Sequence, residues 1–264
     1  MGAFFLCYPR RCRKERKNLV ACSGGRDIAD PYYVLNNFTQ LEELAEVLVK
    51  KFKKEGVKKI VYAITPNLSS ESQIEIVGKA LKEADIEILS LERFNAGTKD
   101  FRLAISKAEQ LNPDYYLVYM HNPDTSIFIK QHRSITGKDN ITSIDSFHEM
   151  SSSDWGLVEG LWFVKSALGT VDFINKFKET TSKDGISCTG NLYDNLDLII
   201  WAYENTPLRD GKIIPDNKDV VETLHGIKDR EGAIGKFSID DKGIVRSKAS
   251  LATIKDGKII DIKE

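Results

Sequence analysis

Apolar side chains recur along most of the chain with a spacing that predicts helices and strands in alternation. Between residues 41 and 52 they return every three or four positions, which gives one apolar face of a helix that ends at Gly56. Residues 59–64 and 115–120 are short, continuously apolar runs, as in parallel strands that are covered on both faces. Strands that alternate with helices of about 10–15 residues predict repeated βαβ units and a mostly parallel sheet.

The remaining elements continue this alternation and then change character. The further predicted strands comprise residues 19–22, 86–91, 141–144 and 161–164, and the further helices comprise residues 69–81, 101–108, 124–136, 171–181, 193–204 and 220–224. Ser69, Ser70 and Glu71 are suited to cap the helix at 69–81. From Gly232 onward, turn signals at residues 241–243 and 256–257 predict short antiparallel strands. The fold class is therefore α/β.

Composition excludes several classes of protein. The 264 residues include 38 Lys+Arg and 39 Asp+Glu, and a net charge of −1 gives no electrostatic case for binding nucleic acid. No apolar run approaches the ~18 residues that a membrane-spanning helix needs. The cysteines show no CxxC and no Cys/His ligand spacing, so neither a zinc site nor a disulfide framework is predicted; they are Cys7, Cys12, Cys22 and Cys188.

Residues 1–18 differ from the rest of the chain. They hold six basic residues against Glu15 alone. The apolar stretch at residues 3–7 is too short for a signal peptide, and the positive charge follows it instead of preceding it. Two interpretations stay open: a tail that binds phosphate or an anionic membrane, or a damaged or mis-started N-terminus.

Polar residues follow several of the predicted strands. Open α/β sheets bind ligands outside the carboxyl ends of their strands, where this chain places Ser23, residues 65–69, His121 and Asp145. The alternative is that helix N-caps simply favour such residues. An unpaired charge after a buried strand is costly, so Asp145 is expected to pair with a ligand ammonium or with a structural Arg or Lys.

The string Cys22-Ser23-Gly24-Gly25-Arg26 is the most distinctive short motif. Its two glycines let backbone amides approach a carboxylate or phosphate, although a plain turn and a nucleophilic Ser23 with His121 as its base are alternatives. The four histidines lack HExxH spacing, so we expect surface or packing roles and no metal site.

From about residue 17 onward, the chain resembles the type I solute-binding proteins of ABC transporters, of the branched-chain amino-acid (Leu/Ile/Val) kind. The most specific landmark is Phe-Asn-Ala-Gly-Thr-Lys-Asp-Phe at residues 94–101. The other landmarks follow in family order at residues 17–25, 33–38, 112–114, 128–131, 193–194, 238–243 and 254–258.

The resemblance implies two Rossmann-like lobes with parallel sheets, joined by three crossings. We expect an irregular basic N-terminus at residues 1–18, a first lobe from residues 19–38 and 168–247, and a second lobe from residues 39–167 and 248–264. The first lobe is expected to be incomplete, because the family begins with further first-lobe strands and helices. An incomplete lobe would leave apolar surface bare, so we expect a poorly soluble or oligomeric chain. Because one side of the cleft would be missing, we expect it to bind free amino acids weakly or not at all.

The resemblance also implies a ligand site in the interlobe cleft. Ser23, Gly24, Gly25 and Arg26 would hold the ligand's carboxylate and part of its ammonium. Ser69 and His121 would cover the ligand, and Asp145 would pair with the α-ammonium.

The implied function is to bind an amino acid and present it, by cleft closure, to the transporter's permease in the inner membrane. The parent protein would lie in the periplasm or cell envelope, whereas this chain, in which no signal peptide is recognised, is expected either to follow it or to remain in the cytoplasm. No cofactor, metal or catalytic residue is expected. A sensory or regulatory domain of the same fold is the alternative; an enzyme would need a general base beside a nucleophile or metal, and none is readable.

Overall fold

The computed structural model describes residues 19–23, 29, 32–183, 185, 188–209 and 211–262. Residues 1–18 and Gly24, Gly25 and Arg26 therefore lie outside the described residues. The chain divides into two compact units. Unit 1 comprises Met1–Gln40 and Ala167–Lys248, and unit 2 comprises Leu41–Ser166 and Ala249–Glu264.

Unit 2 contains a four-stranded parallel sheet in the order β4-β3-β5-β6. Its strands are β3 (Lys59–Ile64), β4 (Glu87–Arg93), β5 (Tyr115–Tyr119) and β6 (Ile141–Ser143). The two continuously apolar runs are the central strands, and they pair with each other in parallel from Ile60 opposite Tyr115 to Ile64 opposite Tyr119. The predicted parallel sheet is confirmed.

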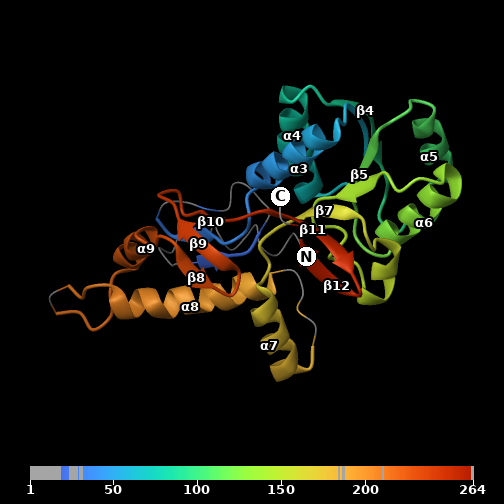
Figure 1. Cartoon of the computed structure of the whole chain (residues 1–264). Coiled ribbons are helices and arrows are strands. Elements are labelled where there is room, and N and C mark those ends of the chain that lie inside the picture. The colour runs from blue at the N-terminus through green and yellow to red at the C-terminus, as the bar shows by residue number, and fades with distance from the viewer. Residues whose placement is uncertain are drawn as a thin grey trace. The chain divides into compact units, whose positions relative to one another are not determined.

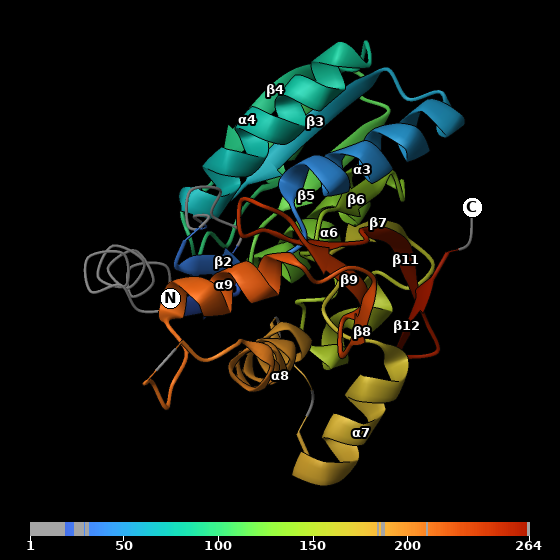
Figure 2. The same ribbon diagram turned by 90° about the vertical axis from the view of Figure 1, so that its left-hand side faces the viewer.

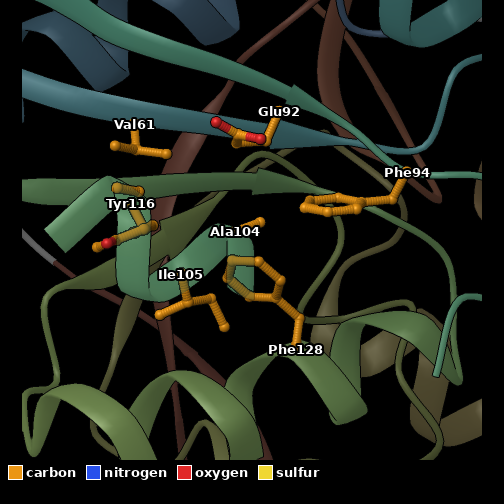
Figure 3. A pocket seen from close by; sticks show the side chains of 8 residues that line it. Val61, Glu92, Phe94, Ala104, Ile105, Tyr116 and Phe128 are labelled. Carbon is orange, nitrogen blue, oxygen red and sulfur yellow. The ribbon is translucent and has the colours of Figure 1, made fainter. Parts of the chain in front are cut away.

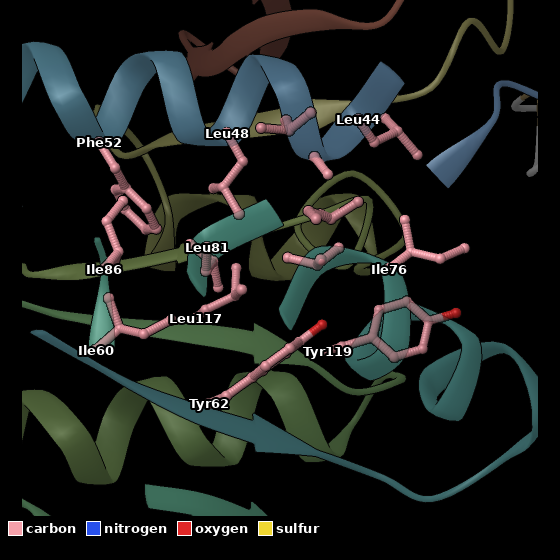
Figure 4. Close-up of a cluster of buried hydrophobic side chains, with 14 of the residues drawn as sticks. Leu44, Leu48, Phe52, Ile60, Tyr62, Ile76, Leu81, Ile86, Leu117 and Tyr119 are labelled. Carbon is pink, nitrogen blue, oxygen red and sulfur yellow. The ribbon is translucent and has the colours of Figure 1, made fainter. Parts of the chain in front are cut away.

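Two helices cover each face of this sheet (Figures 1 and 2). Helices α3 (Leu41–Glu55) and α4 (Leu68–Glu83) pack on one face, and α5 (Arg102–Glu109) and α6 (Asp124–Thr136) pack on the other. Because side chains alternate along a strand, Ile60 and Tyr62 of β3 lie under α3 and α4 (Figure 4), while Val61 and Ala63 join the opposite core. This double coverage explains why β3 is apolar at nearly every position.

A second, antiparallel sheet completes unit 2. Its order is β12-β11-β7, built from β7 (Trp162–Lys165), β11 (Ser250–Lys255) and β12 (Lys258–Asp261). The turn signal at residues 256–257 lies between β11 and β12, where Asp256 and Gly257 both have positive φ. A 3-10 helix, η1 (Ser152–Leu157), precedes β7. The predicted antiparallel ending is confirmed.

The described residues of unit 1 form two small sheets and three helices. Strands β1 (Leu19–Ala21) and β2 (Val34–Asn36) pair in parallel, and β8 (Arg230–Gly232), β9 (Gly235–Ile239) and β10 (Val245–Ser247) form an antiparallel sheet. The helices are α7 (Val171–Thr181), α8 (Thr189–Asn205) and α9 (Asn217–His225). Leu35 and Phe237 are buried with Leu198 of α8 and Val220 of α9 in the core of this unit.

A disulfide joins Cys22, directly after β1, to Cys188, directly before α8. The expectation that the cysteines form no disulfide framework is wrong in this respect. The two residues are 166 positions apart, so no local spacing motif could reveal them. They meet because β1 and α8 pack together, with Asn195 of α8 donating from Nδ2 to the carbonyl of Val20 at 3.2 Å.

Candidate functional site

Polar side chains gather at the carboxyl edge of the parallel sheet in unit 2. Ser69 lies in the first turn of α4, which follows β3, and His121 follows β5. Asp145 follows β6. Parallel strands bring their carboxyl ends to the same edge, so three of the predicted site residues lie on neighbouring connections of one sheet.

Asn67 is the N-cap of α4, and of the predicted capping residues Ser69, Ser70 and Glu71 only Ser70 takes part in the cap. The Asn67 Oδ1 accepts a hydrogen bond from the Ser70 amide at 2.9 Å, and the Ser70 hydroxyl accepts one from the Asn67 amide at 2.8 Å. Together the two bonds form a capping box. The helix therefore begins earlier than predicted, and the Ser69 hydroxyl is not used as a cap. It accepts instead from the Tyr119 hydroxyl at 2.9 Å.

His121 is joined to two neighbours through its two ring nitrogens. Its Nδ1 lies 3.4 Å from Oε2 of Glu149, and its Nε2 lies 3.4 Å from Nδ2 of Asn67. The hydrogen bond to Glu149 raises the pKa of His121, with burial acting in the opposite direction. More than half of the His121 side chain remains exposed, so the ring also faces solvent.

Glu149 is the functional candidate that sequence reasoning missed. It lies four residues after Asp145, in a stretch without a helical or strand pattern. Its position beside His121 depends on the path of the chain after β6, and no motif in the sequence marks it. The sheet edge therefore carries a carboxylate and an imidazole side by side.

Asp145 is buried, with 7% of its surface exposed, and its backbone φ is positive at 63°. Its carboxylate accepts the Ser166 amide at 2.7 Å and the Ser166 hydroxyl at 2.6 Å, and it lies 3.7 Å from Nδ1 of the buried His148. Burial raises the pKa of Asp145 and lowers that of His148. Among the described residues the carboxylate is stabilised by the two Ser166 donors and not by the structural Arg or Lys that was one of the two expectations; the other, a ligand ammonium, stays a prediction.

Ser23 lies in unit 1, directly after Cys22. Its amide donates to Oδ1 of Asn36 at 3.1 Å, and Nδ2 of Asn36 donates to the Ser23 carbonyl at 2.8 Å. The side chain of β2 residue Asn36 therefore fixes the backbone where the glycine-rich turn begins. The role of Ser23 toward a ligand stays a prediction.

The hollow in Figure 3 is a part of the hydrophobic core. It lies between strands β3, β4 and β5 and helices α5 and α6, and its lining comprises Val61, Glu92, Phe94, Ala104, Ile105, Ala108, Tyr116 and Phe128. Phe94 and Phe128 both pack edge-on against Phe101, at 4.8 and 5.3 Å between ring centroids. No water-sized space remains among these side chains, so this hollow is not a ligand site.

No helix in the described part of the chain is long and apolar enough to cross a membrane. Within the same residues, no group of three or more His, Cys, Asp or Glu side chains is arranged to hold a metal ion.

Comparison with known proteins identifies the fold. The sequence profile of the periplasmic binding proteins matches residues 13–258. The structure is similar to a leucine binding protein, LivK, from Thermotoga maritima, with 18% identity and a TM-score of 0.78 over 99% of this chain and 77% of that one. No curated protein sequence gives a significant match.

Two further solved structures show a similar degree of likeness. One is the branched-chain amino acid binding protein LivJ from Streptococcus pneumoniae in complex with isoleucine, with 17% identity and a TM-score of 0.73 over 96% of this chain and 75% of that one. The other is an ABC transporter solute binding protein from R. palustris in complex with benzoate, with 13% identity and a TM-score of 0.80 over 97% and 73%. At these identities the likeness shows a shared fold.

Proposed function

Because the chain belongs to the periplasmic binding protein family, we propose that it binds an amino acid, of the branched-chain type or a related one, for an ABC transporter. The observation that carries this proposal is the match over residues 13–258, together with the polar cluster at the carboxyl edge of unit 2. The solved structures named above bind leucine, isoleucine and benzoate, all of which carry a carboxylate.

The chemistry of the sheet edge fits a small zwitterion. The Ser69 and Tyr119 hydroxyls and the Asn67 amide supply neutral hydrogen-bonding groups. The His121–Glu149 pair adds an imidazole that becomes cationic on protonation and a carboxylate. The first complements the carboxylate of a zwitterionic ligand and the second complements its ammonium. Ser69 and His121 stay in the proposed ligand set, as do Ser23 and the turn Gly24, Gly25 and Arg26.

In this proposal the protein performs no chemistry on its ligand. Binding stabilises the closed form of a two-lobed protein, and a permease of the inner membrane then recognises that form. The ligand shifts the equilibrium between the open and closed forms only because it binds the closed form more tightly. The permease can therefore distinguish ligand-bound from free protein by the closed conformation.

The Cys22–Cys188 disulfide supports an extracytoplasmic location for the parent protein. Disulfides persist in oxidising compartments such as the periplasm and are rare in the cytosol. Non-reducing and reducing peptide mass maps of protein isolated from its own cells would test this location. A Cys22 thiol found unpaired in most molecules would contradict it.

Calorimetric titration of the purified chain tests the proposed function. The ligands are leucine, isoleucine, valine and glutamate, with benzoate as a carboxylate that lacks an ammonium. We expect saturable binding of at least one amino acid and weaker binding of benzoate. No heat of binding with any of the amino acids would contradict the proposal.

Single substitutions then test the site. His121→Ala and Ser69→Ala should each weaken binding, by about 1–2 kcal/mol for the loss of a hydrogen bond to the ligand. His225→Ala is the matched control, because His225 ends α9 in unit 1 and belongs to no part of the proposed cluster.

Asp145→Asn separates a ligand role from a structural one. If Asp145 pairs with a ligand ammonium, removing its charge should weaken ligand binding by about 2–4 kcal/mol. Asparagine tolerates the positive φ at this position, so the backbone can stay in place. An unchanged affinity would remove Asp145 from the ligand site and leave it as the acceptor for Ser166. Ser166→Ala is the companion variant, because it removes one donor and retains the charge.

A further inference from the structure

Helix α8 exposes a row of large apolar side chains and buries several polar ones. The buried positions include Asn191, Asp194 and Asn195, which are 0–4% exposed, beside the buried apolar Leu198 and Ala202. The exposed large apolar side chains of the same helix are Leu192, Tyr193, Leu196, Ile200 and Tyr203. A helix at the surface of a monomer normally presents polar side chains to the solvent instead.

Hydrogen bonds hold α8 in this rotation. The Asp194 carboxylate accepts the amides of Ala233 and Ile234 at 2.6 and 2.9 Å. Asn195 Oδ1 accepts from Nδ2 of Asn37 at 2.9 Å. Turning the helix to bury its apolar side would leave these buried polar groups without partners, at a cost of about 1–3 kcal/mol each. These bonds therefore favour the rotation in which the apolar side chains of the helix are exposed.

The exposed side chains form one stripe, which we call the α8 stripe: Leu192, Tyr193, Leu196, Ile200 and Tyr203. At 3.6 residues per turn, these five positions fall within roughly 100° of the helix circumference, as on a helix face that packs against another helix. Asp197 and Glu204 lie beside the stripe and not within it. Asp197 is paired with Arg230 at 2.7 Å, so one bordering charge is already compensated.

Exposed apolar side chains continue at both ends of the stripe. Phe173 of α7 contacts Tyr193, with ring centroids 5.2 Å apart, and the side chain of Val171 is exposed on the same helix. At the other end lies the loop that follows α8 (Figure 1). Its side chains Leu208, Ile213 and Ile214 are exposed, with Ile213 92% exposed. An ion pair of 2.6 Å between Arg209 and Asp219 ties this loop to α9.

The exposed area is large for a monomer. The nine exposed side chains between residues 171 and 214 present on the order of 1,000 Å². The largest apolar patch of a typical monomer is about 300–600 Å², and each partner of a standard interface contributes about 800 Å². The patch therefore has the area that a stable dimer requires.

We propose that a second copy of this chain covers this surface, with the α8 stripes of the two copies packed antiparallel around a two-fold axis near Leu196. A two-fold interface joins identical patches, and the stripe meets its own apolar counterpart with no charge inside it. The net charge of −1 gives little repulsion between copies. This inference concerns the assembly of the chain and is independent of the ligand.

Light scattering coupled to size-exclusion chromatography tests the dimer at several micromolar concentrations. The wild-type chain should elute with about twice the 29.8 kDa of a single chain. Leu196→Asp places two charges at the two-fold axis and should raise the dimer dissociation constant by about tenfold or more. Leu196 is 61% exposed in the single chain, so the substitution should not disturb folding, which circular dichroism verifies.

Leu103→Asp is the matched control, because Leu103 is 70% exposed on α5 and belongs to unit 2, whereas the α8 stripe belongs to unit 1. It should leave the dimer unchanged. Mixing Leu196→Asp with Leu196→Lys chains should restore association, because the opposite charges then meet at the axis. A wild-type monomer at all concentrations, equal effects of the Leu196 and Leu103 substitutions, or a mixture that stays monomeric would each overturn the proposal.

Discussion

Acid should destabilise unit 2 through His132, a fully buried histidine on α6. Its ring packs edge-on against Tyr116 at 4.6 Å and stacks on Phe128 at 6.4 Å between centroids. Neither ring nitrogen has a hydrogen-bond partner among the described residues. Burial lowers the pKa of His132 from 6.5 to about 4, because the imidazolium would lose its hydration without gaining an acceptor.

The sign of the effect follows from linkage. The unfolded chain takes up a proton at a pKa near 6.5, whereas the folded chain resists protonation until about pH 4. Protons therefore favour the unfolded state throughout this window, and the stability present above pH 6.5 is lost as the pH falls. At 1.36 kcal/mol for each pKa unit, the loss is about 2 kcal/mol by pH 5 and about 3 kcal/mol by pH 4.

Urea denaturation of wild type and His132→Phe between pH 7.5 and pH 4.5 isolates this contribution. Phenylalanine is apolar and of similar size, so it should pack beside Tyr116 and Phe128 without titrating. In a Trp201→Phe background, tryptophan fluorescence reports unit 2 alone, which contains Trp155 and Trp162. Buried His148 and the carboxylates titrate in both proteins and cancel in the difference.

The two stability curves should diverge as the pH falls, with the wild type losing about 2 kcal/mol more than the variant by pH 5. His121→Asn is the control with the opposite sign, since hydrogen bonding to Glu149 raises the pKa of His121. Without His121, the free energy of unfolding should fall slightly more steeply as the pH is lowered. Parallel curves for wild type and His132→Phe would refute the assignment of a neutral, unpartnered His132.

Three further substitutions or treatments test other features. Reducing the disulfide, or replacing Cys22 and Cys188 by serine, should lower the unfolding temperature of unit 1 by an amount equivalent to about 2–4 kcal/mol and leave the calorimetric transition of unit 2 in place. Gly190→Ala should destabilise by at least about 2 kcal/mol, measured by urea denaturation, because its new Cβ would lie 2.4 Å from the Leu168 carbonyl oxygen. Gly78→Ala should instead stabilise by up to about 1 kcal/mol, because that helical site offers its Cβ only an ordinary contact; destabilisation there would contradict the contrast.

The sequence predicts most of unit 2 because the spacing of its apolar residues distinguishes the buried strands from the helices that cover them. Residues 59–64 and 115–120 are apolar at successive positions, which is compatible with a strand covered on both faces, and the structure places them at the centre of the sheet. The helix at residues 124–136 was recognisable from its spacing and from Gly137, which adopts the left-handed conformation expected of a C-cap. Local patterns suffice where each element meets a conventional apolar core.

Prediction fails where a residue's partner lies far along the chain. The position of Asp145 after a strand is readable, but its acceptor role toward Ser166, 21 residues later, is not. Glu149 reaches His121 through the tertiary path of the loop after β6. The candidate site is thus predicted by position along the sheet edge, while the bonds that decide each residue's role come from the folded structure.

Helix α8 shows why a correct helix prediction can still mislead about its environment. Its apolar spacing predicts an apolar face turned inward, yet Asp194 and Asn195 at its buried face are bonded to segments 39 to 175 positions away. Each such bond is modest alone, but leaving one of these groups buried without a partner costs about 1–3 kcal/mol, which is comparable with exposing one leucine to water. The rotation of α8 therefore depends on these polar groups together with the buried Leu198 and Ala202, and the apolar stripe is left outside. A surface that results in this way is fixed by the fold before any partner arrives, which is the condition for a preorganised interface.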